Sequence, residues 1–406
     1  MTFKASFWLK LSIVNLLLVA VLGVLMRYKI GFEFPYFNQK SLQHAHSHFA
    51  FAGWVTHTIM TLMIFVLYKY AKFSISPKPY LLLLFVNLIC SYGMFFSFIY
   101  QGYGSISITF STLTIFISYL FTYFFIRDLK KTSIEQSTQL WFKGALFFNV
   151  ISSIGTFYLA YMMATKNVIQ NHYLSSIYYY LHFQYNGWFL FACLGFLYLF
   201  LELKDTENKN YKRIFYWFFI SCIPTFFLSI LWAKLPVWIF VLTVIATLLQ
   251  TFAWFKLVLL LKTQVIKALK NVHPILKMIF ICVFIAMSLK IIFQLLSTIP
   301  SLSQLAFGFR PIVIAYLHLV LLALISLFLL FYIYANNLLP YNRIVLYGLE
   351  VVLIGVLLNE IVLAIQGTAA LSYTRVPFVN EGLFLISLFI FLGTLILCFS
   401  LKKRQN

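Results

Sequence analysis

The sequence predicts an all-α membrane protein with about twelve transmembrane helices. Only 10% of the 406 residues are charged and 63% are hydrophobic, whereas soluble domains carry roughly 25% charged residues. The mean hydropathy is +0.94. Apolar runs of about 20 residues, long enough to cross a bilayer, recur along the whole chain. These observations exclude a soluble globular fold and favour a polytopic membrane protein.

Twelve runs are long enough to form spanning helices. The first is too long for the apolar region of a signal peptide and lacks an A-x-A-like cleavage site, so we expect it to remain as a helix. Pro224 is the one proline that interrupts a run deeply. Because the connections are short, we expect residues 1–406 to form a single transmembrane domain. The predicted spans are 6–27, 46–70, 79–100, 104–127, 139–163, 174–202, 212–232, 236–262, 276–298, 309–334, 342–366 and 381–401.

The net charge of +21 comes from 30 Lys and Arg residues against 9 Asp and Glu residues. The basic residues concentrate in alternate connections, which predicts that both termini are cytoplasmic in a multi-pass protein of the bacterial inner (plasma) membrane. The excess then serves topology and contact with the anionic lipid bilayer, and nucleic-acid binding is not expected. The residues predicted on the cytoplasmic side are Lys69, Lys72, Lys78, Arg127, Lys130, Lys131, Lys204, Lys209, Lys212, Arg213, Lys262, Lys267, Lys270, Lys277, Lys402, Lys403 and Arg404.

One short motif occurs twice. HFAFAGW begins at His48 and HFQYNGW begins at His182, and a third histidine, His318, shares Tyr-Leu-His with the second copy. The spacings are 134 and 136 residues, which puts the histidines in the second, sixth and tenth predicted spans. Repetition of this kind indicates a structural unit used more than once. The simplest description is three units of four helices, at approximately 1–130, 131–270 and 271–406.

The three histidines could share one metal site. Their helices run in the same direction, and His182 and His318 lie about 8 to 9 residues, or ~12 Å, inside the predicted outer boundary. His48 is at a similar depth if its helix begins earlier, near Gln43. A lone histidine near a helix end is more often an interfacial residue, but three at matched spacing favour a common site. Gly53 and Gly187 would let a flat ligand or a neighbouring helix approach the backbone closely.

Imidazole is a ligand for zinc, copper and iron. The five cysteines stand singly within apolar runs, and no C-x-x-C-H motif is present for covalent attachment of haem. An apolar interior in which 20% of residues are aromatic suits a non-covalent, b-type haem, whose iron accepts axial imidazoles. Copper is the second metal that these histidines could bind.

The chain resembles subunit I of the haem-copper oxidases and their nitric-oxide-reductase relatives. The resemblance rests on helix count, orientation, the four-helix period and the stretch HAHSHFAFAGW, which is similar to helix two of cbb3-type subunits; NnrS-type proteins are another twelve-helix relative. It implies three four-helix arcs and a low-spin haem held by His318 and one of His44, His46 and His48. It places His182 at a ligand position of the copper centre.

The choice of helix-two ligand stays open from the sequence. At about 100° per residue His44 and His48 share one helix face, whereas His46 lies nearly opposite, in line with Gly53 and His57. The repeat favours His48, since it aligns with His182.

The chain also departs from the family. Predicted helix seven (212–232) has no histidine, helix ten has a single one, and no HPEVY-like stretch follows His182. A complete dioxygen-reducing centre is therefore not expected. The predicted function is a membrane haem protein in electron transfer or diatomic-gas (O2 or NO) chemistry, with respiratory-chain or cytochrome partner subunits. Whether it is a haem-dependent oxidoreductase stays open, and the alternatives are a transporter and a non-haem copper protein.

Ionisable residues within spans are functional candidates, because charge is costly in lipid. Lys256 lies near a helix end and is expected to extend to the interface. Lys290 and Glu360 could form an ion pair or a proton route, and Lys290 could contact a haem propionate. Gln184 and Asn186 are polar where the first copy of the motif has alanine, so they could hydrogen-bond a ligand, a water or a metal-bound histidine.

Overall fold

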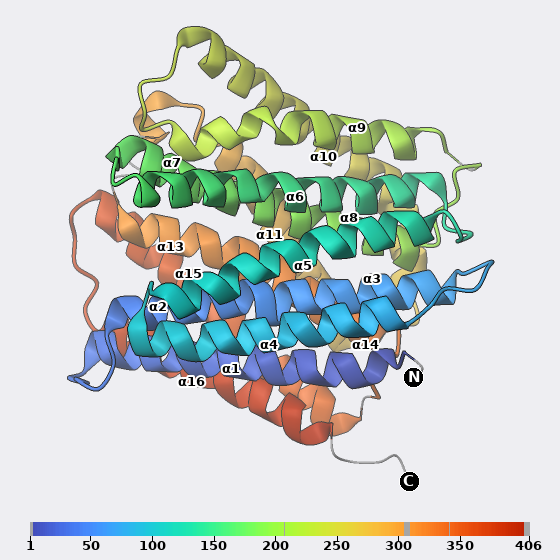
Figure 1. The fold of residues 1–406 in the computed structure, drawn as a ribbon, viewed down its shortest axis with the longest axis horizontal. Helices are drawn as coiled ribbons and strands as arrows, with labels where there is room; N and C mark the ends of the chain where they lie inside the picture. The colour runs from blue at the N-terminus through green and yellow to red at the C-terminus, as the bar shows by residue number, and fades with distance from the viewer. Residues whose placement is uncertain (1–2, 207, 304–308, 341, 402–406) are drawn as a thin grey trace. The chain divides into compact units, whose positions relative to one another are not determined.

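The computed structural model describes residues 3–206, 208–303, 309–340 and 342–401, which form long helices joined by short connections (Figure 1). Within these ranges there is no β-strand, and Ala71 and Thr132 form an isolated bridge. Eleven of the described helices are long and apolar enough to cross a membrane, or twelve if a bent pair counts as one span. The predicted all-α polytopic fold of about twelve helices is confirmed. The predicted cytoplasmic residues Lys402, Lys403 and Arg404 lie outside the described residues.

The chain divides into two compact units. Unit 1 comprises Met1–Ser133, His273–Ile279 and Ser326–Asn406, and unit 2 comprises Ile134–Val272 and Phe280–Ile325. Two of the boundaries between the units, at 133/134 and 272/273, fall close to the predicted repeat boundaries. The third predicted repeat, in contrast, is divided between the two units. The single domain and the three repeats stay predictions.

Unit 1 contains the helices from both ends of the sequence. α1 runs beside α16 (Figure 1), and the Cys398 thiol of α16 donates to the carbonyl oxygen of Ile13 at 3.5 Å. α15 and α16 pack so closely that a Cβ on Gly393 would lie 2.7 Å from the backbone nitrogen of Val352, as small residues allow in membrane helix pairs. The elements are α1 (Ala5–Gly31), α2 (Gln39–Phe49), η1 (Ala50–Thr56), α3 (His57–Lys69), α4 (Lys78–Gln101), α5 (Ser105–Leu129), α14 (Leu327–Ala335), α15 (Arg343–Leu371) and α16 (Val379–Ser400).

The second helix begins earlier than predicted, at Gln39 instead of residue 46. The Asn38 side chain accepts hydrogen bonds from the backbone nitrogens of Lys40 at 2.9 Å and Ser41 at 3.1 Å. A side-chain oxygen at this position satisfies amides that have no partner within the helix. The three candidate histidines of helix two therefore lie inside a continuous helical segment.

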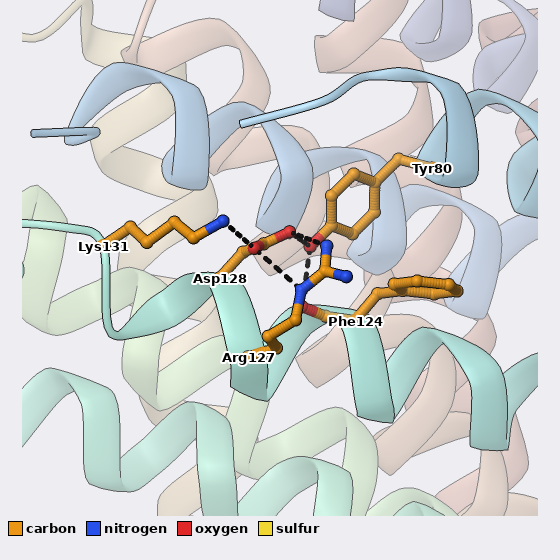
Figure 2. A network of polar contacts seen from close by, with 5 residues as sticks. All are labelled: Tyr80, Phe124, Arg127, Asp128 and Lys131. Carbon is orange, nitrogen blue, oxygen red and sulfur yellow. Dashed lines mark hydrogen bonds and ion pairs between the residues drawn. The ribbon is translucent and has the colours of Figure 1, made fainter. Parts of the chain in front are cut away.

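A buried carboxylate joins α4 to α5 (Figure 2). Asp128 is 0% exposed; Arg127 binds it through two nitrogens, at 3.0 and 2.8 Å, and Lys131 contacts it at 2.9 Å. The Tyr80 hydroxyl lies 2.9 Å from Asp128 Oδ2 and 2.9 Å from the carbonyl oxygen of Phe124, so it can donate to either. This ionic network is a structural link between two helix ends.

Unit 2 contains a broken helix at the predicted seventh span. α9 ends at Cys222, and a 3-10 helix starts at Pro224 with a bend of 41°. Proline has no N–H and its ring clashes with the preceding turn. The amide of Phe226 therefore bonds to the carbonyl of Ile223, and the Cys222 carbonyl is available to other donors. The elements are α6 (Gln136–Ala164), α7 (Gln170–His182), η2 (Phe183–Phe189), α8 (Leu190–Phe200), α9 (Asn210–Cys222), η3 (Pro224–Ile230), α10 (Val237–Leu269), most of α11 (Pro274–Leu296), α13 (Arg310–His318) and all but the last residue of η4 (Leu319–Ser326).

Candidate functional site

Each repeat histidine stands just before a π-helical segment. His48 precedes η1 by two residues, His182 directly precedes η2, and His318 directly precedes η4. π-helical turns are rare and occur frequently at functional sites. The third copy, which lacks the Gly-Trp of the motif, shares this backbone feature with the other two. The similarity of the three stretches thus extends from sequence to backbone conformation.

Buried amide side chains hold the first π-helical segment. Asn15 of α1 donates to the carbonyl oxygen of Gly53 at 2.6 Å, and Asn87 of α4 donates to that of Ala52 at 3.2 Å. Asn15 in turn accepts a hydrogen bond from Tyr92 at 2.9 Å. Carbonyl groups in a wide helical turn need such partners when they are buried. Sequence analysis did not identify Asn15 or Asn87, although asparagine in the middle of an apolar run is a usable signal.

The helix-two histidines point in two directions, as their spacing predicts. His48 and Tyr103 share a hydrogen bond of 2.9 Å, and the imidazole of His48 stacks on the ring of Phe98 with centroids 4.4 Å apart. The His44 ring lies 4.5 Å from that of Tyr103, and its Nε2 is buried without a hydrogen-bond partner. His44 and His48 are therefore together beside the α4–α5 connection.

His46 faces α1 instead. Its Nδ1 lies 3.1 Å from the carbonyl oxygen of Val19, and because a carbonyl can only accept, Nδ1 carries the proton and Nε2 the lone pair. Gly23 keeps α1 close, since a Cβ there would lie 3.6 Å from Cε1 of His46. Metal-binding histidines usually donate their other ring N–H to a carbonyl or carboxylate. This geometry favours His46, whereas the repeat alone favours His48.

His318 has the same tautomer as His46. Its Nδ1 lies 2.8 Å from the carbonyl oxygen of Ile314, one turn earlier in α13, so the lone pair is again on Nε2. The ring is partly buried. The imidazole of His318 thus has the protonation pattern expected of a metal ligand.

His182 uses both ring nitrogens within unit 2. Its Nε2–H donates to the Cys222 carbonyl at 2.8 Å, and its Nδ1 accepts from Asn186 at 3.1 Å. Of the partners expected for Asn186, the structure shows a histidine, and whether that histidine binds a metal stays a prediction. Gln184 instead donates to Asn149 at 2.9 Å and to Ser152 at 2.8 Å. A metal at His182 would have to replace one of its two bonds.

The two glycines of the motif are covered by phenylalanine. A Cβ on Gly187 would lie 2.4 Å from Cβ of Phe148 in α6, so this glycine admits a neighbouring helix, one of the two predicted alternatives. A Cβ on Gly53 would lie 2.8 Å from the ring of Phe49 on the same helix. Neither contact tests whether these glycines also approach a cofactor, which stays a prediction.

In the described ranges, no group of three or more His, Cys, Asp or Glu side chains is arranged to hold a metal ion. The shared site of His48, His182 and His318 therefore stays a prediction. His57 is a further buried histidine that sequence analysis did not propose as a ligand. Its ring lies 5.8 Å from that of Trp8, and neither ring nitrogen has a hydrogen-bond partner.

Comparison of the chain with models of known protein families gave no match, and comparison with curated protein sequences gave no significant match. The function is therefore inferred from the chemistry of the residues described above.

Proposed function

We propose that this multi-pass membrane protein binds haem and serves electron transfer or diatomic-gas chemistry, with His46 as an axial ligand. The supporting observation is the hydrogen bond from His46 Nδ1 to the Val19 carbonyl oxygen, at 3.1 Å. It leaves the lone pair on Nε2, which is the form of imidazole that ligates iron. His318, the second ligand predicted from the sequence, has the same tautomer. Each of the two imidazoles thus has the form expected of an axial haem ligand.

A bound b-type haem would supply a one-electron centre. The chain's own contribution is to orient the imidazole through the Val19 hydrogen bond. Leu42, Ala45 and Phe49 flank His46 along α2 and are fully buried in an apolar cluster that includes Leu22 of α1. The hydrogen bond to the Val19 carbonyl fixes both the tautomer and the ring orientation.

The proposal does not include a complete copper centre. Both nitrogens of His182 are engaged, by Cys222 and Asn186, and the predicted seventh span has no histidine. We further propose a plasma-membrane location with cytoplasmic termini, on the basis of the charge asymmetry, and electron exchange with respiratory-chain or cytochrome subunits. Copper at His182 and oxidoreductase activity remain secondary proposals.

An absorption spectrum of the detergent-purified protein, before and after haem supplementation, tests the proposal. We expect a Soret band of a low-spin haem that is lost in His46→Ala and His318→Ala and retained in His48→Ala and in the control Lys256→Ala. A pyridine haemochrome assay identifies the haem type, and metal analysis measures copper. The absence of a Soret band in both preparations would overturn the proposal. Loss in His48→Ala with retention in His46→Ala would instead reassign the ligand.

A further inference from the structure

We propose that unit 2 contains a binding site for a small carboxylate-sized anion, anchored by Lys290. The site is a cluster of buried polar side chains, here named the Lys290 cluster, whose members are 0 to 6% exposed. None of its members is one of the proposed axial ligands, so the site does not require haem to be bound. The Lys290 cluster consists of His182, Asn186, Cys222, Gln250, Lys290 and Gln294.

Three members of the cluster, His182, Asn186 and Cys222, are in contact with one another. Cys222 Sγ lies 4.0 Å from Nε2 of His182 and 3.8 Å from the carbonyl oxygen of Asn186. The Lys290 ammonium interacts electrostatically with both Cys222 and His182. The broken helix at Pro224 therefore brings the end of α9 to the second π-helical segment and to α11.

Helix register puts Gln250 at about the level of Lys290. Trp254 of α10 donates to Ser288 of α11 at 3.2 Å, which sets the register of these two helices. The helices are joined by a short connection and run antiparallel. Gln250, one turn before Trp254, is therefore opposite the turn of α11 that carries Lys290, at ~1.5 Å per residue. Both side chains are buried.

Lys290 has no counter-charge in the described structure. It is 0% exposed and donates one hydrogen bond, at 2.9 Å, to the neutral amide oxygen of Gln294. An ammonium group has three donors. The ion pairs formed by the described residues involve Asp128 and Asp205, and none involves Lys290. Burying an ammonium without a partner is unfavourable, so an anion that binds Lys290 would compensate it.

Other cluster atoms also lack partners. Asn186 Oδ1 and both amide atoms of Gln250 are buried without any hydrogen-bond partner. The Gln250 amide nitrogen can donate to an anion beside Lys290, and Asn186 Oδ1 can accept from an ordered water or a protonated ligand. The cluster offers a cation and amide donors, and both ring nitrogens of His182 are already engaged by Cys222 and Asn186, which favours an anion over a metal ion. The burial of all its members favours a compact, monovalent anion such as formate or nitrite.

Thermal unfolding of the detergent-purified, full-length protein tests this site. Haem-free and haem-loaded samples are titrated with sodium formate or sodium nitrite at constant ionic strength, with bulky sodium gluconate as the balancing salt. We expect a saturable rise in the unfolding temperature with formate and nitrite, because a ligand that binds the native state stabilises it. If haem loading alone removes the response, the anion at Lys290 is a carboxylate of the cofactor and not a free ion.

Substitutions identify the residues on which the rise in unfolding temperature depends. Lys290→Met should abolish the response and raise the unfolding temperature of the ligand-free protein, because it removes an unpaired buried charge. Gln250→Leu should weaken the apparent affinity about tenfold. Lys256→Met removes an exposed lysine of α10 and should keep the wild-type response. A wild-type protein without a saturable response, or a Lys290→Met variant that responds like the wild type, would overturn the proposal. The readout requires no haem spectrum, so the two proposals can fail separately.

Discussion

Among the residues that the structure describes, each unit buries one charged side chain, of an Asp or a Lys, completely, and the surroundings of the two charges differ. Asp128 in unit 1 is 0% exposed and has Arg127 and Lys131 as cationic partners (Figure 2). Lys290 in unit 2 is also 0% exposed, but its hydrogen-bond acceptor is the neutral Gln294. The two charges are therefore buried to the same extent, but only the charge of Asp128 has partners of opposite charge.

The difference separates a structural charge from a candidate binding site. A buried ion whose partners are complete links helices and has little capacity left for a ligand. A buried ion with unfilled hydrogen-bonding capacity is unfavourable unless another group binds it. The carboxylate of Asp128 also accepts a hydrogen bond from the Tyr80 hydroxyl. In the Lys290 cluster, by contrast, atoms of Asn186 and Gln250 are buried without hydrogen-bond partners. Changing the compensation of either charge tests this interpretation.

The largest expected effect comes from removing the compensation of Asp128. The double variant Arg127→Met and Lys131→Met leaves a buried carboxylate with only Tyr80 beside it, and we expect a loss of about 3 kcal/mol in the free energy of unfolding. Titration of the protein in mixed micelles with a denaturing detergent measures it. Adding Asp128→Asn should restore part of the loss, since it removes the unpaired charge.

A matched control separates compensation from net charge. Lys69→Met with Lys72→Met also removes two basic charges from the same unit, but both lysines are exposed. We expect its effect to stay within about 1 kcal/mol. Equal losses in the two double variants would show that the Asp128 network has no special role.

A smaller effect of opposite sign is expected when Lys290 receives a counter-charge. Gln294→Glu places a carboxylate where the amide oxygen now lies 2.9 Å from the Lys290 nitrogen. We expect a gain of about 1 kcal/mol in the free energy of unfolding and a loss of the response to formate. The same unfolding titration measures both.

The sign of this change is informative. If another group already compensates Lys290, the new carboxylate would be buried without a partner and the protein would lose stability. Gln366→Glu, the same substitution on partly buried α15 in unit 1, should give no gain and serves as the control.

The helices could be predicted from the sequence because lipid imposes a length and a polarity on each span. Apolar runs of about 20 residues sufficed to predict every candidate span, and Pro224 marked the one that is broken. An earlier start of α2, near Gln43, was considered from the sequence, but the start at Gln39 was not predicted, because it depends on a cap from Asn38 whereas the prediction followed hydropathy. Local sequence thus predicts the spans better than it predicts their ends.

The candidate site was only partly predictable, because its contacts join residues far apart in the chain. The motif identified His48, His182 and His318, but the π-helical turns after them have no recognised pattern in the sequence. Which nitrogen carries the proton depends on groups such as the Val19 carbonyl for His46 and the Cys222 carbonyl for His182. Asn186 was expected to hydrogen-bond a ligand, a water or a metal-bound histidine, and in the structure it donates to His182, one turn earlier in the same motif.

The smallest expected effect is that of Lys131→Met alone, at most about 0.5 kcal/mol in the free energy of unfolding. Lys131 is 38% exposed and contacts Asp128 through one nitrogen, whereas Arg127 binds both carboxylate oxygens. With Arg127 in place the buried carboxylate keeps a cationic partner, so little compensation is lost. The losses from the single variants should therefore sum to less than the loss in the double variant, which the same unfolding titrations measure. Additive losses would mean that Asp128 does not depend on having at least one cation, and its contrast with Lys290 would then fail.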